Sequence, residues 1–189
     1  DQRENRAALR PLVGNARVLD TFTHTGGFAL HAAHYGAREV IAVDISDHAA
    51  EYVAANAALN DLQGKVQVVL ANVFDILKEY QQRGEKFDVV ILDPPAFCKS
   101  KSALKGAYRG YKEINLRAMK IINTGGFLIS CSCSHYMYPE IFQKMLLEAA
   151  KDAKKALRII ESRVQAKDHP IVSSYNESLY LKCVIMQVL

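Results

Sequence analysis

Short runs rich in β-branched residues alternate along this chain with longer Ala- and Leu-rich amphipathic stretches, and this alternation constrains the fold most. Short apolar runs bounded by turn residues predict buried strands, whereas apolar residues spaced three or four apart predict helices. Such alternation is typical of a parallel sheet with crossover helices. The first strands are predicted at Arg17–Asp20, Glu39–Asp44, Val66–Leu70, Phe87–Asp93 and Gly126–Ser132.

The amphipathic stretches predict the connecting helices. Two further apolar runs follow the last helix with no room for a helix between them, so they should pair antiparallel at one end of the sheet. We therefore expect a Rossmann-like, doubly wound, mostly parallel seven-stranded α/β sheet with an antiparallel C-terminal strand pair. The helices are expected at Phe28–Tyr35, Asp47–Asn60, Val73–Arg83, Tyr111–Asn123 and Tyr138–Lys154, and the strand pair at Leu157–Arg163 and Ser178–Val188.

Length and composition predict one globular domain over residues 1–189. The chain is 50% hydrophobic and 23% charged, which is ordinary for a globular protein. No apolar run reaches the roughly 18–20 residues of a membrane span, and the opening DQRENR is no signal peptide. Four cysteines make no disulfide scaffold, so a cytoplasmic protein with reduced thiols is expected. Because the chain starts without Met, we expect a C-terminal catalytic part of a longer protein.

Ligands of doubly wound sheets bind beyond the carboxyl ends of the strands, where the strand order reverses. The first predicted strand ends in VLDTFTHTGGFAL, in which Gly26 and Gly27 let the backbone approach a ligand closely. The spacing is not that of a dinucleotide fingerprint, and there is no Walker A lysine. A turn opened by Asp20 instead suits a ligand with a cationic or amine group and no phosphate bridge. An ordinary tight turn before a helix would explain the same residues equally well.

The next two strand ends indicate a nucleoside. Asp44 ends the second strand, where a carboxylate can hold a ribose diol, and Asp47 is better placed to cap the following helix. The third strand runs into ANVFD, where Asn72 could accept a hydrogen bond from adenine and Phe74 could pack on it. Together the three ends predict a nucleoside without phosphates and point to S-adenosylmethionine.

The fourth strand ends in DPPAF. Two successive prolines remove two hydrogen-bond donors and hold the backbone extended, which presents Asp93 at the rim of the cofactor site. Phe97 can stack on a planar substrate. A basic segment without acidic residues follows and contains Tyr108 and Tyr111, a pattern that suits phosphate contact with base stacking, or merely a solvated loop. Its cations are Lys99, Lys101, Lys105, Arg109 and Lys112.

The stretch ISCSCSH places Cys131 and Cys133 two residues apart at the end of the fifth strand. A disulfide between them is disfavoured because cysteines at this spacing in a strand are poorly placed for one. A zinc site with Cys98 and His135 lacks the usual C-x₂-C spacing, so no metal is expected. Core packing of both cysteines and a nucleophilic Cys133 remain open, with Cys131 expected in the core.

Five motifs carry a resemblance to a known family. V-L-D-x-F-x-x-T-G-G-F, V-D-x-S, D-P-P-x-F, R-G-Y-K-x-I-N and S-C-S occur in this order. They resemble class I S-adenosylmethionine-dependent methyltransferases, and more narrowly the bacterial enzymes of the large-subunit methyltransferase I type, which make 5-methylcytosine in 23S ribosomal RNA. DQRENR and DHPIVSSYNESLYLK are similar to the same group, so the resemblance covers nearly the whole chain. Such enzymes carry a small N-terminal PUA-type RNA-binding domain, in keeping with the expectation that this chain is part of a longer protein.

The resemblance implies the chemistry and its residues. Cytosine C5 is a poor nucleophile, so Cys133 would add to C6 first, and Asp93 would favour protonation at N3. S-adenosylmethionine would contact Asp20, Thr21, Phe22, Thr25, Gly26, Gly27, Asp44, Ile45, Ser46, Asn72, Val73, Phe74, Asp93 and Pro94. The 23S RNA would contact Pro95, Phe97, Lys99, Lys105, Arg109, Tyr111 and Lys112. Neither a metal nor a membrane is implied, and a monomer or homodimer is expected.

Two departures and two alternatives accompany this interpretation. Asn72 stands where relatives usually have Asp, and Ala96 where many have Lys. An N-methyltransferase acting on a ribosomal guanine or another amine would need no cysteine nucleophile. A non-catalytic RNA-binding module is disfavoured, because it has no physical reason to keep the carboxylates and glycines of the strand ends together.

Overall fold

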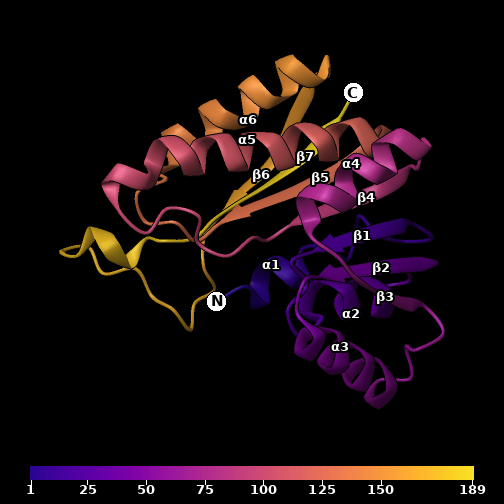
Figure 1. Ribbon diagram of the computed structural model, residues 1–189. Coiled ribbons are helices and arrows are strands. Elements are labelled where there is room, and N and C mark those ends of the chain that lie inside the picture. The colour runs from indigo at the N-terminus through magenta and orange to yellow at the C-terminus, as the bar shows by residue number, and fades with distance from the viewer.

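The chain forms a seven-stranded sheet with helices on both faces (Figure 1). The structure, a computed structural model, describes the backbone of residues 1–189 and the side chains of residues 1–175 and 177–189. The described strands lie in the order β3-β2-β1-β4-β5-β7-β6, with β7 antiparallel to both of its neighbours. The expected fold is therefore confirmed, including the strand pair at one end. The strands are β1 (Arg17–Thr21), β2 (Glu39–Asp44), β3 (Val66–Leu70), β4 (Phe87–Leu92), β5 (Ile122–Ser132), β6 (Leu157–Arg163) and β7 (Lys182–Val188).

Each face of the sheet buries its own apolar cluster. The cluster on one face contains side chains of α4, α5 and α6, and the cluster on the other contains side chains of α2 and α3. Figure 1 shows these two sets of helices on opposite sides of the strands, with α1 beside α2. The helices are α1 (Arg3–Ala7), α2 (Gly27–His34), α3 (Asp47–Leu59), α4 (Val73–Arg83), α5 (Leu104–Ile121) and α6 (Pro139–Ala153), with short 3₁₀ turns at Lys101–Ala103 and Asn176–Ser178.

Local sequence signals explain where several helices begin. Ser46 caps α3 by accepting a hydrogen bond from the Ala49 amide, and Asn72 caps α4 by accepting one from the Phe74 amide. Pro139 occupies the first turn of α6, where its missing N–H costs nothing. Within the described chain, no helix is both long and apolar enough to cross a membrane.

Three elements begin at least four residues away from the expected position, and a fourth element was not expected. The helix expected at Tyr111 begins at Leu104, so much of the basic segment is helical rather than a loop. The fifth strand begins at Ile122, four residues earlier than expected, and β7 begins at Lys182 rather than at Ser178. The five-residue helix α1 was not expected, because a short polar turn has no apolar periodicity.

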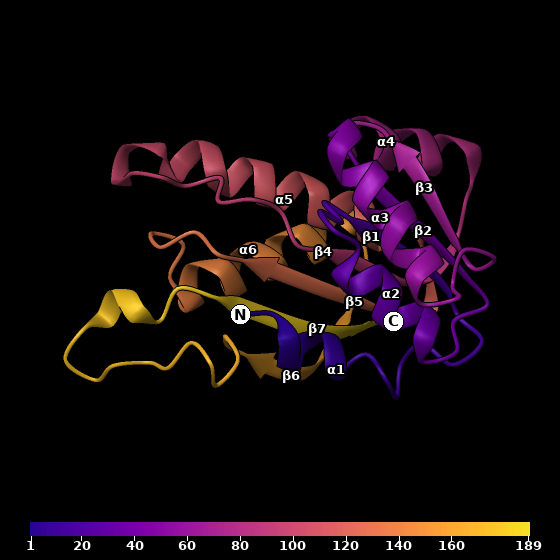
Figure 2. The same cartoon turned by 90° about the horizontal axis from the view of Figure 1, so that it is seen from below.

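The topology places the N-terminus near the reversal of strand order, between β1 and β4. The long segment between β6 and β7 extends beside the N-terminus in both views (Figures 1 and 2). The Ala166 amide donates to the Asp1 carbonyl oxygen over 2.8 Å, and Asn5 donates to the Val164 carbonyl oxygen over 3.2 Å. These contacts hold α1 over the carboxyl ends of the central strands.

Candidate active site

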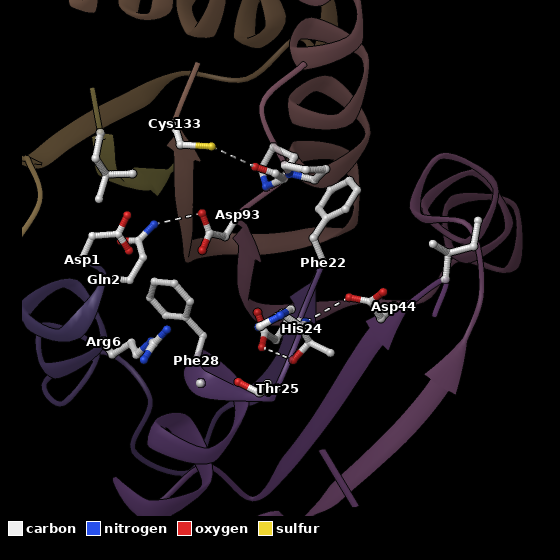
Figure 3. A pocket seen from close by; sticks show the side chains of 17 residues that line it. Asp1, Gln2, Arg6, Phe22, His24, Thr25, Phe28, Asp44, Asp93 and Cys133 are labelled. Atoms are coloured by element: carbon white, nitrogen blue, oxygen red, sulfur yellow. Dashed lines mark hydrogen bonds between the residues drawn. The ribbon is translucent and has the colours of Figure 1, made fainter. Parts of the chain in front are cut away.

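A cavity of about 530 Å³ opens at the carboxyl ends of β1, β2, β4 and β5. Its wall includes residues of α1, the β1–α2 turn, the end of β2 and the DPP stretch after β4. Figure 3 shows Cys133, Asp93 and Gln2 around one part of this cavity and Asp44 at another. The structure thus brings together strand ends that the sequence analysis treated one at a time.

Asp20 lies buried at the end of β1 and lines the cavity. Its Oδ2 accepts hydrogen bonds from the Thr23 hydroxyl (2.6 Å) and the Ala29 amide (2.9 Å). Its Oδ1 is buried with no hydrogen-bond partner among the described residues. Burial, and then the charge of Asp93, raise the pKa of Asp20 to about 7 against the two hydrogen bonds. The charge of Arg6 also lowers the pKa of Asp20, but among the described residues no cation forms an ion pair with this carboxylate, so a bound ligand could provide one.

The two glycines of the β1–α2 turn are each required there for a different structural reason. Gly26 caps α2 with a positive φ of 84°, a conformation that side chains rarely adopt. A Cβ on Gly27 would lie 2.5 Å from Cζ of Arg6, so the absence of a side chain lets the guanidinium of α1 lie over the turn. The Arg6 Nε is buried and has no partner among the described residues. The cation Arg6, from α1, and the carboxylate Asp20, at the end of β1, therefore both line the cavity.

The end of β2 forms a second polar edge. Asp44 Oδ2 accepts from the His24 amide over 2.9 Å, and its Oδ1 accepts from the Ser46 amide over 3.1 Å. These bonds fix the carboxylate and leave further lone pairs for a ligand. Ile45 lines the cavity beside it and is 68% exposed, an apolar surface suited to a flat ring.

Backbone strain is concentrated in the loop between β1 and α2. Phe22 and His24 have φ angles of 57° and 53°, in the left-handed region that costs a non-glycine residue about 1–3 kcal/mol. Both line the cavity. Thr25, which also lines it, uses its carbonyl oxygen to accept a hydrogen bond of 3.0 Å from Asn56 of α3. The fold thus holds this loop in a conformation that its own residues disfavour.

Asp93 follows β4, and its carboxylate is hydrogen-bonded to the N-terminal segment of the chain, which the sequence did not predict. Gln2 donates from Nε2 to Asp93 Oδ1 over 2.9 Å, and Asn5 in turn donates to the Gln2 side-chain oxygen over 2.7 Å. Burial raises the pKa of Asp93, while the Gln2 hydrogen bond and the charge of Arg6 oppose the rise. Asp93 therefore keeps a proton to higher pH than an exposed carboxyl group.

Cys133 follows β5 and lines the same cavity. It is partly exposed, whereas Cys98, Cys131 and Cys183 are buried. Its Sγ lies 3.9 Å from the Pro94 carbonyl oxygen. Burial and then the charge of Asp93 raise the pKa of its thiol. The expected core position of Cys131 is confirmed, and it pairs with Cys183 across β5 and β7.

Buried hydroxyls support the turn that carries Cys133. The Tyr111 hydroxyl lies 2.9 Å from Ser134 Oγ and accepts from the Ser132 hydroxyl over 3.0 Å. Ser134 Oγ also accepts from the Cys98 amide over 3.0 Å. The two serines of the S-C-S motif thus connect the end of β5 to the segment after the two prolines, with Cys133 between them.

Several predicted cofactor residues support the cavity from outside its wall. The Thr21 hydroxyl donates to the Ile91 carbonyl oxygen over 2.8 Å inside the sheet. Asn72 Oδ1 accepts from the Phe74 amide and so caps α4. The phenyl ring of Phe74 packs 6.0 Å from that of Phe97. The predicted cofactor residues that do not line the cavity are Thr21, Gly26, Ser46, Asn72, Val73 and Phe74.

The predicted RNA-binding residues separate into three groups. Lys99, Lys105 and Arg109 are exposed on the segment before and within α5, and Pro95 lines the cavity. The other three face the protein interior or another helix. Phe97 packs 4.7 Å from the ring of Tyr111, which is fully buried, and Lys112 forms ion pairs with Glu148 (3.5 Å) and Asp152 (2.9 Å) of α6.

These positions correct the expectation for two residues. Tyr111 has no surface to offer a base, because it lies under Phe97 in the core. Lys112 is directed to the acidic face of α6 instead of to the cavity. Among the described residues, no group of three or more His, Cys, Asp or Glu side chains is arranged to hold a metal ion.

The sequence analysis missed the residues that reach the cavity from the ends of the chain. Gln2 precedes α1, Arg6 belongs to α1, and Leu181 precedes β7. Their sequence signals were the polar opening DQRENR and, for Leu181, the segment DHPIVSSYNESLYLK, both used for the family resemblance but not for site residues. Lys182, buried beside the S-C-S turn, is the last residue of that segment. It was not taken as a site residue because a lysine at a strand end is ordinarily expected to be exposed.

The strand order, the antiparallel β7 and a cavity beyond β1, β2 and β4 define the class I S-adenosylmethionine-dependent methyltransferase fold. Residues 5–160 match the family model described as Conserved hypothetical protein 95, and the chain belongs to that family.

Known proteins agree with the resemblance inferred from the motifs. The chain is 48% identical over 183 residues to Ribosomal RNA large subunit methyltransferase I of Salmonella arizonae, an alignment that covers 96% of this chain and 45% of the relative. The Salmonella newport protein of the same name gives the same values. The chain thus spans less than half the length of the curated relatives it matches. The resemblance to this methyltransferase group is confirmed.

Solved structures confirm the fold. A candidate methyltransferase, SMU.776, solved in complex with SAH, superimposes with a TM-score of 0.86 at 24% identity and covers 99% of this chain and 49% of its own. A candidate SAM-dependent methyltransferase from Streptococcus mutans gives a TM-score of 0.88 at 24% identity, with 99% and 48% of the chains covered.

Proposed function

We propose that this chain is the catalytic part of an S-adenosylmethionine-dependent RNA methyltransferase that methylates C5 of a cytosine in 23S ribosomal RNA. The observation that carries the proposal is the position of Cys133. Among the four cysteines it is the one that is not buried, and it lines the same cavity as Asp93. The relatives named Ribosomal RNA large subunit methyltransferase I support the substrate class.

The cavity fits S-adenosylmethionine by its size and its donor set. Its volume of about 530 Å³ lies within the roughly 300–1,000 Å³ usual for small-molecule sites. The unpartnered Oδ1 of Asp20 would take the ammonium group, and the unpartnered Nε of Arg6 would take the carboxylate. Asp44 would hold the ribose hydroxyls, and Ile45 would lie against the adenine. When bound, the cofactor supplies a methyl group on a positively charged sulfur.

Cys133 and Asp93 provide the groups that cytosine activation needs. The Cys133 thiolate would form a bond to C6 and move an electron pair toward C5, which then accepts the methyl group. Loss of the C5 proton to a base re-forms the C5–C6 double bond and expels the thiolate. The raised pKa of Asp93 suits a carboxyl group that keeps a proton to donate at N3, which makes C6 more electrophilic.

One observation favours an N-methyltransferase as the second candidate. Burial and the charge of Asp93 raise the pKa of the Cys133 thiol, so most molecules hold it protonated at neutral pH. An amine substrate gripped by Asp93 and the Pro94 carbonyl group would need no thiolate. The two candidates differ in whether methylation requires Cys133.

A mechanism-based trap separates the candidates. RNA that contains 5-fluorocytosine is incubated with S-adenosylmethionine and the wild-type chain, Cys133→Ala or Cys131→Ala. Fluorine cannot leave as the C5 proton does, so an enzyme with the proposed mechanism stays covalently attached to the methylated RNA. We expect this adduct with the wild-type chain and with Cys131→Ala, and none with Cys133→Ala.

Methylation that survives Cys133→Ala on ordinary RNA would refute the C5 mechanism and favour the N-methyltransferase. Cys131→Ala is a matched control because it removes a thiol from the same strand two residues away, from a buried position. Calorimetry with S-adenosylmethionine alone tests the cofactor separately. A chain that binds RNA but not the cofactor would be a non-catalytic RNA-binding module.

A further inference from the structure

Lys182 is a buried lysine at the base of the turn that carries Cys133. It is 6% exposed, although an ammonium group taken out of water costs several kcal/mol unless it is compensated. Its Nζ donates to the carbonyl oxygens of Ser134 (2.7 Å) and Tyr180 (2.9 Å). In the β5–β7 ladder it lies opposite Ser132. The ammonium group is therefore bonded to the backbone one residue after Cys133.

No carboxylate of a described side chain forms an ion pair with Lys182 within 4.0 Å. Burial lowers the pKa of Lys182 to about 8, and the thiols of Cys133 and Cys98 act in the opposite direction. Two hydrogen bonds to carbonyl oxygens leave its charge uncompensated. A thiolate at the adjacent turn would supply the missing negative charge.

We propose that Lys182 is a positioning residue for Cys133, which holds the turn after β5 through the carbonyl group of Ser134 and stabilises the Cys133 thiolate by its positive charge. The proposal rests on the proposed function only because that function uses the thiolate as a nucleophile. The coupling itself needs no RNA and no cofactor, because both groups belong to the folded chain.

Other groups around the Cys133 thiol also affect its ionisation. Burial and Asp93, at the end of β4, raise the pKa of the Cys133 thiol, and Lys182 opposes them from β7. The hydroxyls of Tyr111 in α5 and Tyr180 before β7 also interact with the thiol, and both stay protonated near neutral pH because their pKa values are raised, chiefly by burial. From α1, Arg6 adds a second cation to the cavity wall. Lys182 is the cation that contacts the backbone of the turn itself.

The test is the pH dependence of Cys133 alkylation. Iodoacetamide reacts with the thiolate, so the rate of modification follows thiol ionisation. Mass spectrometry of the peptide that contains Cys133 gives this rate from about pH 6 to about pH 10 for wild type, Lys182→Met and Lys182→Gln. The buried Cys98 and Cys183 lie in other segments and report any loss of the fold.

We expect Lys182→Met to slow alkylation about tenfold near neutral pH, where Lys182 carries its charge. Lys182→Gln can still donate a hydrogen bond to a carbonyl group but has no charge, so it should resemble Lys182→Met. Lys182→Arg keeps the charge and should restore most of the rate.

A folded Lys182→Met or Lys182→Gln whose profile coincides with that of wild type would overturn the proposal. Rapid alkylation of Lys182→Gln together with slow alkylation of Lys182→Met would also overturn it, since turn geometry alone would then control the thiol. Folding of each variant is checked by circular dichroism. If Cys133→Ala retains methylation, the proposed function fails while the alkylation result for Lys182 still stands.

Discussion

Replacing Asp20 with asparagine should stabilise the free protein at slightly alkaline pH and at the same time weaken cofactor binding. The pKa of Asp20 is raised to about 7 from an ordinary value of 3.8, chiefly by burial and then by the charge of Asp93. Folding at pH 8 therefore forces a buried carboxylate to ionise, and the charge of Arg6 and two hydrogen bonds offset its burial only in part. Asn keeps the shape and an oxygen that can accept from Thr23 and Ala29, but it cannot ionise.

The sign and size follow from proton linkage. Between about pH 5 and pH 7 the folded chain keeps the Asp20 proton that the unfolded chain has released, so the free energy of unfolding falls as pH rises. Each pH unit in this window costs about 1.4 kcal/mol, or roughly 3 kcal/mol over the window. Above pH 7 the Asp20 contribution levels off. We expect the stability of Asp20→Asn relative to wild type to increase by roughly 3 kcal/mol from pH 5 to pH 8.

The assay is urea unfolding of both proteins at several pH values in this range. Asp88→Asn is a matched control on the same sheet. Although burial acts against it, hydrogen bonds from the Arg17 amide and Asn123, with the charges of Arg38 and Arg17, lower the pKa of Asp88. Its carboxylate is charged in both states above about pH 5, so Asp88→Asn should lose stability equally at each pH.

Parallel stability curves for Asp20→Asn and wild type would refute the reasoning, because Asp20 would then be an ordinary ionised capping residue. Calorimetry at pH 8 tests the second part. Loss of a charge-assisted bond to the ammonium group should weaken S-adenosylmethionine binding at least about tenfold, or about 1.4 kcal/mol. Unchanged affinity would remove Asp20 from the cofactor site.

Two further predictions concern the turn and the RNA surface. Gly26→Ala places a side chain at a positive φ with apolar neighbours at 3.3 Å and should lower the free energy of unfolding by about 1–2 kcal/mol. Gly14→Ala, with open space around it, should not, as urea midpoints will show. Lys105→Ala with Arg109→Ala should reduce the salt dependence of RNA binding by about one phosphate contact each. Lys112→Ala, whose ammonium group pairs with α6, should leave that slope unchanged in filter-binding titrations.

Periodicity predicted the sheet well because each central strand is buried on both faces. The edge strands β3 and β6 also have the expected bounds, although β6 is mostly exposed. Among the central strands, the bounds of β2 coincide with those expected, and β1 and β4 differ by one residue. Such strands read as apolar runs whose limits are set by local turn residues. The strand-end residues Asp20, Asp44 and Asp93 followed from the same pattern, since parallel strands bring their carboxyl ends to one edge.

Residues whose orientation depends on tertiary packing could not be predicted in this way. The basic segment looked like a loop because Gly106 and Gly110 weaken helix propensity, yet α5 includes both. Packing of its apolar face, including Tyr111, against the core outweighs that cost. Once the segment is helical, residue 112 faces α6 and Tyr111 faces the core, whereas Lys105 and Arg109 remain exposed.

The residues that only the structure identified act on the pKa values of the candidate catalytic residues that the sequence identified. Burial raises the pKa of both Asp93 and Cys133, and their mutual repulsion adds to the effect on the thiol. Gln2, which precedes α1, lowers the pKa of the Asp93 carboxyl group, and Lys182, in β7, lowers the pKa of the Cys133 thiol. Each comes from a segment distant in the chain from its partner, so no local motif contains the pair. Strand-end patterns can therefore identify the candidate reacting groups, whereas their protonation depends on long-range contacts that require the folded structure.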